Sequence, residues 1–93
     1  MDREVMMLQL RQAYGGTVGE RRAVARAAAD LAASGQYVAD TGVEMTPTRI
    51  IEELADAPEG GPADRWNWWM GALDLAYGDY GRFTVHRWKN RTE

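Results

Sequence analysis

A segment of about residues 63–77 constrains the fold most, because it is apolar on almost every side of a helix. With about 100° between successive residues, one wide face collects the large apolar residues, which are Trp66, Trp69, Met70, Leu73, Ala76 and Tyr77. Only Asn67 and Asp74 form a polar strip. A helix that is apolar nearly all round is normally buried on several sides. The segment therefore predicts either the centre of the domain or a helix that a partner partly covers.

A second apolar stripe, formed by Trp68, Ala72 and Leu75, lies nearly opposite the wide face. The chain has 93 residues, and domains of this size bury only about 60–65% of the surface that their unfolded chains expose. We therefore expect these three residues to bind a partner, either a second copy in a homodimer or another protein. The alternative interpretation assigns the tryptophans to the core of the domain itself.

The composition is that of one folded domain, residues 1–93, in a reducing compartment. Hydrophobic residues make up 45% of the chain, which includes four tryptophans, and disordered segments carry less apolar mass. The chain contains no cysteine, which excludes disulfides, thiol nucleophiles and thiolate metal sites. Neither a secretion signal nor a membrane span is visible, since the first residues are charged and the apolar runs are short. We expect a cytoplasmic protein that does not enter a membrane.

Helical periodicity and punctuating residues predict four helices, over residues 2–14, 18–34, 47–57 and 63–77. Thr17 and Glu20 fit a capping box, in which the hydroxyl accepts from the Glu20 amide and the carboxylate returns to the Thr17 amide. Gly35 can take the left-handed conformation that ends the second helix. Thr46 and Pro47 are typical of the cap and the first residue of the third helix.

Two short segments lack the helical period and predict a minor sheet. Residues near 37–39 precede a predicted turn at residues 40–42. Residues 82–88 alternate the apolar side chains of Phe83 and Val85 with their neighbours, as a half-buried strand does. The predicted fold class is therefore mostly α, of the α+β type, with four helices and a two- or three-stranded sheet.

Counted from the second helix, the order helix, strand, helix, turn, helix, strand resembles an incomplete winged helix-turn-helix. Thr46–Ala57 would be the supporting helix, Asp64–Tyr77 the recognition helix and Arg82–Trp88 the first wing strand. A helix that reads the major groove offers Arg, Lys, Asn or Gln to base edges, whereas this one carries mostly bulky apolar groups. The topology would then serve as a scaffold for other interactions.

A local concentration of basic residues near the C-terminal end is the main support for nucleic-acid binding. It consists of Arg82, Arg87, Lys89 and Arg91, interleaved with Phe83 and Trp88, as in many nucleic-acid surfaces. An alternative interpretation uses the uneven charge of the chain, because residues 36–81 carry nine acids and only two arginines. In that interpretation the basic tail lies against the acidic middle of the same chain or of a second copy.

The residues predict no catalytic, cofactor-binding or metal-binding site. The glycine-rich residues 15–19 before Arg21 and Arg22 could attract an anion, but they lack the P-loop lysine and follow a helix, which favours a capped turn. The single histidine, His86, has no local acid, thiol or second histidine for a triad or a metal site. A group of acids predicts a solvated helix face or a surface for a basic partner: Glu52, Glu53, Asp56 and Glu59. We therefore expect that the chain is not an enzyme.

Two stretches of the C-terminal third, Arg65-Trp66-Asn67-Trp68-Trp69-Met70-Gly71 and Tyr80-Gly81-Arg82-Phe83, resemble small uncharacterised proteins of haloarchaea. The resemblance implies a cytoplasmic protein and no particular activity or site. The residues themselves favour a non-enzymatic protein-interaction or regulatory domain that self-associates through its tryptophan-rich helix. The alternative function is a small winged-helix-like nucleic-acid-binding protein.

Overall fold

The computed structural model describes residues 1–86, which form five α-helices and one short 3₁₀ helix. These are α1 (Arg3–Tyr14), α2 (Val18–Ser34), α3 (Gln36–Thr41), α4 (Pro47–Leu54), α5 (Pro62–Tyr77) and η1 (Gly81–Phe83). The four predicted helices are confirmed as α1, α2, α4 and α5, although α4 ends three residues before the predicted end at residue 57.

Short polar side chains cap the N-terminal ends of α1, α2 and α4. The Thr17 hydroxyl accepts from the Glu20 amide at 3.1 Å, and the Thr46 hydroxyl accepts from the Arg49 amide at 3.1 Å. Pro47 occupies the first turn of α4, where its missing donor costs nothing. Gly35 ends α2 in the left-handed conformation, with φ at 74°. These capping residues determine most of the helix boundaries through interactions between residues close in sequence.

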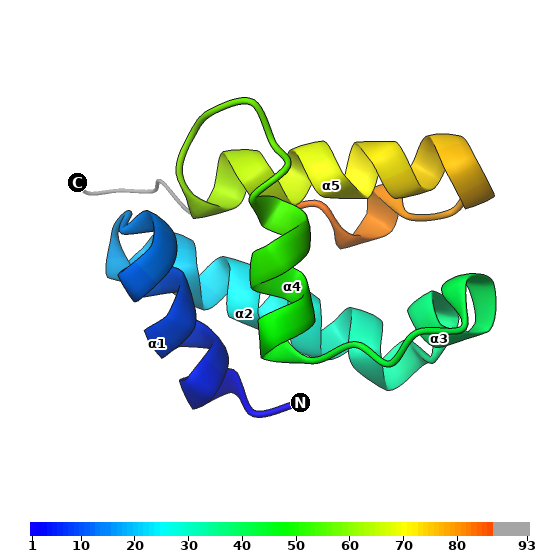
Figure 1. Cartoon of the computed structure of the whole chain (residues 1–93), viewed down its shortest axis with the longest axis horizontal. Helices are drawn as coiled ribbons and strands as arrows, with labels where there is room; N and C mark the ends of the chain where they lie inside the picture. The colour runs from blue at the N-terminus through cyan, green and yellow to red at the C-terminus, as the bar shows by residue number, and fades with distance from the viewer. Residues whose placement is uncertain (87–93) are drawn as a thin grey trace.

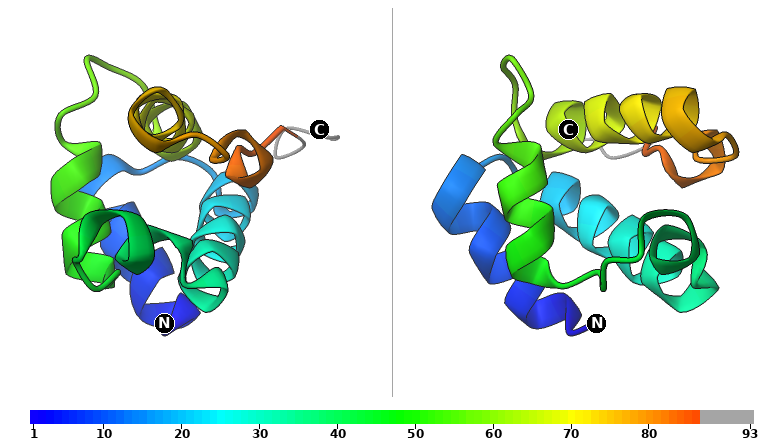
Figure 2. Two further views of the ribbon diagram at one scale, coloured as in Figure 1. Left: turned by 90° about the vertical axis from the view of Figure 1, so that its right-hand side faces the viewer. Right: turned by 45° about the vertical axis from the view of Figure 1, so that its right-hand side comes forward.

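The helices pack around α2, which contacts α1, α3 and α5. Helix α4 lies across the molecule and contacts both α1 and α5 (Figure 1). Seen end-on in Figure 2 (left), α5 lies at the top of the molecule, with α4 and α2 below it on opposite sides. The largest fully buried side chains of the core include Met6, Leu10, Val24, Leu31, Ile50, Leu54, Trp66 and Met70. The wide apolar face of α5 therefore faces the core.

The predicted sheet is wrong, because the structure contains no strand within residues 1–86. Residues 36–41, expected near a strand at 37–39, form the short helix α3. Two glycines in the left-handed conformation bound this helix, Gly35 and Gly42, with φ at 74° and 75°. The Tyr37 ring is buried and meets the Trp69 ring edge-on at 5.5 Å. A six-residue helix is too short to show the helical period in sequence, so its tertiary contacts decide its conformation.

Residues 82–86 alternate as predicted but do not form a strand. Phe83 and Val85 are buried, whereas Thr84 is half-buried and His86 is exposed. No neighbouring strand within residues 1–86 pairs with this segment; the side-chain amide of Asn67 does so instead. The remaining residues of the predicted strand, 87 and 88, lie outside the described residues. The winged-helix-like arrangement is therefore also wrong, since the described chain supplies neither of its strands.

The capping box at the start of α2 forms only in part, because the Glu20 side chain caps a different helix. Its carboxylate oxygen Oε2 accepts from the Ala63 amide at 2.8 Å, in the first turn of α5, and the residue is only 6% exposed. A Cβ atom at Gly16 would lie 2.6 Å from the other carboxylate oxygen, and one at Gly61 would lie 2.9 Å from Oε2. Glycine is therefore required at both positions for the carboxylate to fit between the two loops.

Candidate functional site

Residues 66–69 of α5 divide their side chains between the core and the surface. The Trp66 ring is fully buried, and its Nε1 donates to the carbonyl of Phe83 at 2.8 Å. The Trp69 ring is 4% exposed and meets the Trp66 ring edge-on at 5.6 Å, in the arrangement that aromatic rings prefer. These two tryptophans are therefore core residues, as the alternative interpretation of the cluster expected.

The polar strip of α5 holds the segment that follows the helix. The Asn67 side chain donates to the Val85 carbonyl at 2.9 Å and accepts from the Val85 amide at 2.8 Å. The carboxylate of Asp74 accepts from the Tyr80 amide at 3.0 Å. Both polar residues thus satisfy backbone groups of the returning chain, which explains why this side of the helix is not apolar.

The remaining side of α5 is apolar and exposed. Trp68 is 40% exposed and Leu75 is 90% exposed, and both Gly71 and Ala72 between them are also exposed. We call Trp68, Gly71, Ala72 and Leu75 the outer face of α5. Figures 1 and 2 show α5 at the periphery of the molecule, with the other helices on one side of it. The predicted stripe of Trp68, Ala72 and Leu75 is therefore accessible to a partner. Ala76 and Tyr77, which were predicted on the wide buried face, are exposed instead.

The outer face has the residue spacing of a helix–helix contact. Its members follow one another at i, i+3, i+4 and i+7, which places them along one line of the helix. Two large side chains flank two small residues. A Cβ atom added at Gly71 would meet nothing within 4 Å, so the backbone there is open to close approach from outside.

Residues 1–74 match the model of the WNWW domain family. The chain belongs to this family. The family's description spells the one-letter sequence of residues 66–69, which we call the WNWW tetrad. No curated protein and no solved structure matches the chain. In this WNWW domain, Trp66 and Trp69 pack in the core and Asn67 binds the backbone of the segment that follows the helix. The remaining member of the tetrad, Trp68, lies at the surface.

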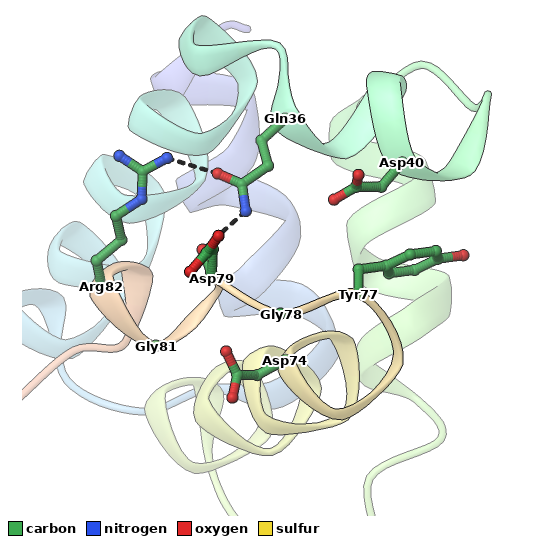
Figure 3. Close-up of a pocket in the computed structure, with 8 residues that line it drawn as sticks. All are labelled: Gln36, Asp40, Asp74, Tyr77, Gly78, Asp79, Gly81 and Arg82. Atoms are coloured by element: carbon green, nitrogen blue, oxygen red, sulfur yellow. Dashed lines mark hydrogen bonds between the residues drawn. The ribbon is translucent and has the colours of Figure 1, made fainter.

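A polar pocket of about 560 Å³ lies where α3, the end of α5 and the turn before η1 meet (Figure 3). Its carboxylates come from Asp40, Asp74 and Asp79. Asp40 already accepts from the Tyr80 hydroxyl at 2.8 Å, and Asp74 accepts from the Tyr80 amide. Burial first, and then the hydrogen bond to Asp40 and its negative charge, raise the pKa of Tyr80 well above its ordinary value. The polar residues of the pocket therefore connect three elements by hydrogen bonds. Their arrangement does not resemble a catalytic site.

Only one of the four predicted nucleic-acid-binding residues can be placed. Arg82 donates to the Gln36 side chain, whose own amide donates to the Asp79 carbonyl (Figure 3). Its guanidinium also lies 4.5 Å from the centre of the Phe83 ring. Arg82 thus borders the acidic pocket, but its hydrogen bond is to the neutral side chain of Gln36. Arg87, Lys89 and Arg91 lie outside the described residues.

The other candidate residues have structural contacts. Arg21 donates to the carbonyls of Gly15 and Gly16, so the glycine-rich turn is held from within. His86 lies 2.7 Å from the Thr84 hydroxyl, and Glu53 pairs with Arg49 at 3.0 Å. Residues 1–86 contain no group of three or more His, Asp or Glu side chains placed to hold a metal ion. No helix in this part of the chain is both long and apolar enough to cross a membrane.

Proposed function

We propose that this WNWW domain is a non-enzymatic protein-interaction domain that self-associates through the outer face of α5. The observation that carries the proposal is the exposure of two large apolar side chains, Trp68 and Leu75, on the side of α5 away from Trp66 and Trp69. Tryptophan is enriched among the residues that dominate the energy of protein interfaces. In the described chain, Trp68 makes no hydrogen bond or ring contact that would require a tryptophan there. The cysteine-free sequence supports a cytoplasmic location for this association.

The pattern of the outer face favours a second copy of the chain as the partner. In an antiparallel pair with the two-fold axis between Gly71 and Ala72, Trp68 of each copy lies opposite Leu75 of the other. The two small residues then face each other at the axis, where the helix backbones approach most closely. Such a face is self-complementary, which is the requirement of a two-fold dimer.

The expected dimer is weak. Helix α5 has 16 residues and is therefore about 24 Å long, and a pair of such faces buries less than the roughly 1,600 Å² of a standard interface. We expect an equilibrium between monomer and dimer that shifts with protein concentration.

Light scattering coupled to gel filtration, run over a series of protein concentrations, tests the proposal. The wild-type protein should move towards the mass of a dimer as its concentration rises. Trp68→Ala should stay monomeric and folded, because truncation of a central aromatic residue commonly costs an interface about 2 kcal/mol or more.

Leu8→Ala provides the matched control, since Leu8 is an exposed apolar residue of α1 (46% exposed) outside the outer face. This variant should associate like the wild type. A wild-type protein that remains monomeric at the highest concentration would refute self-association, and equal loss in both variants would refute the assignment to α5.

A further inference from the structure

A groove of about 590 Å³ runs between α2 and the segment 82–86, on the side of the molecule where Figure 2 (left) shows η1 beside α2. Its floor is apolar and consists of Ala23, Ala27, Phe83 and Val85. Three arginines line its walls: Arg22 and Arg26 from α2, and Arg82 from the opposite side. We call this site the arginine groove. None of its residues belongs to the outer face of α5.

The charge of the arginine groove is positive and largely uncompensated. Within residues 1–86, Arg22 and Arg26 make no hydrogen bond or salt bridge, and both are exposed. They are four residues apart and therefore project from the same face of α2, one turn from each other. Asp30 is the one acidic residue among those that line the groove. The guanidinium groups of Arg22 and Arg26 are therefore available to bind carboxylates or phosphates beside an apolar floor.

The shape of the groove disfavours a long nucleic acid. Phe83 is only 8% exposed and Arg82 lies over its ring, so the Phe83 ring offers a base little surface to stack on. At the Arg82 end, the groove adjoins the pocket that contains Asp40, Asp74 and Asp79. A polyanion that continued past this end would meet these carboxylates. A short acidic ligand that stays inside the groove avoids that repulsion.

We propose that the arginine groove binds a short peptide segment of another protein that carries both acidic and apolar residues. Its carboxylates pair with Arg22 and Arg26, and its apolar side chains cover Ala23, Ala27 and Val85. The volume of the groove lies within the range of about 300–1,000 Å³ that is typical of ligand sites. This proposal does not rest on self-association, because it uses a different surface of the molecule.

A phage-displayed library of random peptides, selected on the full-length protein, tests this inference. The enriched peptides should contain more Asp and Glu, together with apolar residues, than the unselected library. One enriched peptide, labelled with fluorescein, is then titrated with each protein variant and followed by fluorescence anisotropy. Arg22→Glu/Arg26→Glu should weaken binding by at least about tenfold, because it replaces attraction by repulsion.

The matched control is Arg3→Glu/Arg11→Glu, which makes the same change of charge on exposed residues of α1. It should bind the peptide like the wild type, as should Trp68→Ala, which separates this site from the outer face of α5. The inference is overturned if no peptide is enriched, if the enriched peptides are not acidic, or if both double variants bind equally. It is also overturned if a fluorescein-labelled single-stranded oligonucleotide binds the groove more tightly than the peptide.

Discussion

At the scale of single residues, Glu20 links two parts of the chain that are far apart in sequence. Its carboxylate is buried and accepts from the Ala63 amide, 43 residues away. Helix α5 has glycine as its N-cap and receives no capping hydrogen bond from that residue. Glu20 therefore takes the role that a local Ser or Asp has in other helices, and its negative charge also suits the N-terminal end of the helix dipole.

Glu20→Ala should lower the free energy of unfolding by about 1–3 kcal/mol, because it leaves the buried Ala63 amide without an acceptor. Glu20→Gln should lose less, since its amide oxygen can still accept. Urea unfolding followed by circular dichroism measures both. Glu52→Ala, on the exposed side of α4, is the control and should change stability by no more than about 0.5 kcal/mol. A loss of that small size for Glu20→Ala would show that the remote cap contributes little.

Tyr80 makes the stability of the domain depend on alkaline pH. The residue is fully buried, and burial together with its hydrogen bond to Asp40 raises the pKa of its hydroxyl. In the unfolded chain a tyrosine ionises near pH 10. Above about this pH the folded state holds more protons than the unfolded state, so the free energy of unfolding falls as pH rises.

Tyr80→Phe should be less stable at neutral pH, because it loses the hydrogen bond to Asp40. Its free energy of unfolding should fall less steeply above a pH of about 10, because the group that ionises there is gone. The measurement is urea unfolding at a series of alkaline pH values. Tyr77→Phe, which removes a hydroxyl from an exposed side chain, should keep the wild-type slope. An unchanged slope in Tyr80→Phe would mean that another group controls alkaline unfolding.

At the scale of elements, α5 has three sides with different roles. One side forms the core through Trp66, Trp69 and its neighbours, and a second holds the returning chain through Asn67 and Asp74. The third is the outer face, whose residues are exposed in the described chain. The distinction explains why a helix that is apolar nearly all round does not lie at the centre of this molecule.

Replacement of Gly71 by alanine should have opposite effects on the stability of the monomer and on the stability of the dimer. Gly71→Ala should raise the free energy of unfolding of the monomer by up to about 1 kcal/mol, because alanine is the better helix former and its Cβ meets no atom. The same change should weaken the dimer, since it adds a side chain where the helices approach most closely. Gly71→Leu should weaken it further.

Urea unfolding of dilute protein measures the first effect of the Gly71 variants, and analytical ultracentrifugation measures the second. For Gly71→Ala, a more stable monomer together with a weaker dimer is the informative result, because a general loss of folding cannot produce both. If Gly71→Leu dimerises as tightly as the wild type, the two-fold arrangement around Gly71 and Ala72 is wrong.

At the scale of the whole molecule, the small size of the domain makes its stability depend on association with a partner. The Cα radius of gyration is 12.2 Å and the longest dimension is 37 Å. A domain this small buries a limited share of its surface and is marginally stable on its own. A partner that binds only the folded state adds stability in proportion to the logarithm of its concentration.

The midpoint of thermal unfolding should therefore rise with the concentration of the wild-type protein. A concentration of about 100 times the dissociation constant corresponds to a gain of about 2.7 kcal/mol, and each kcal/mol shifts the midpoint by about 4–8 °C in a domain of this size. Trp68→Ala should show a midpoint that does not depend on concentration. Differential scanning calorimetry over a series of dilutions makes this comparison, and a constant midpoint for both proteins would argue against self-association.

The sequence by itself determined the features that depend on neighbouring residues. Caps such as Thr17 and Thr46, together with Gly35, specify where helices begin and end, and the periodicity specifies that Trp66, Trp69 and Leu73 face inward. It also separated Trp68 and Leu75 from the core face, because that separation follows from the geometry of any helix. Four of the five α-helices within residues 1–86 and the accessible stripe could be predicted on these grounds.

Only the tertiary structure decided the features that depend on contacts between distant residues. Residues 36–41 carry no strong local preference, so the packing of Tyr37 on Trp69 makes them a helix. Residues 82–86 alternate like a strand, yet they pair with the side chain of Asn67 because no strand of the described chain lies beside them. The Glu20 carboxylate has two amides within its reach in principle, and the position of α5 selects the distant one. The arginine groove likewise exists only because folding places Arg82 opposite Arg22 and Arg26, a proximity that no local pattern in the sequence records.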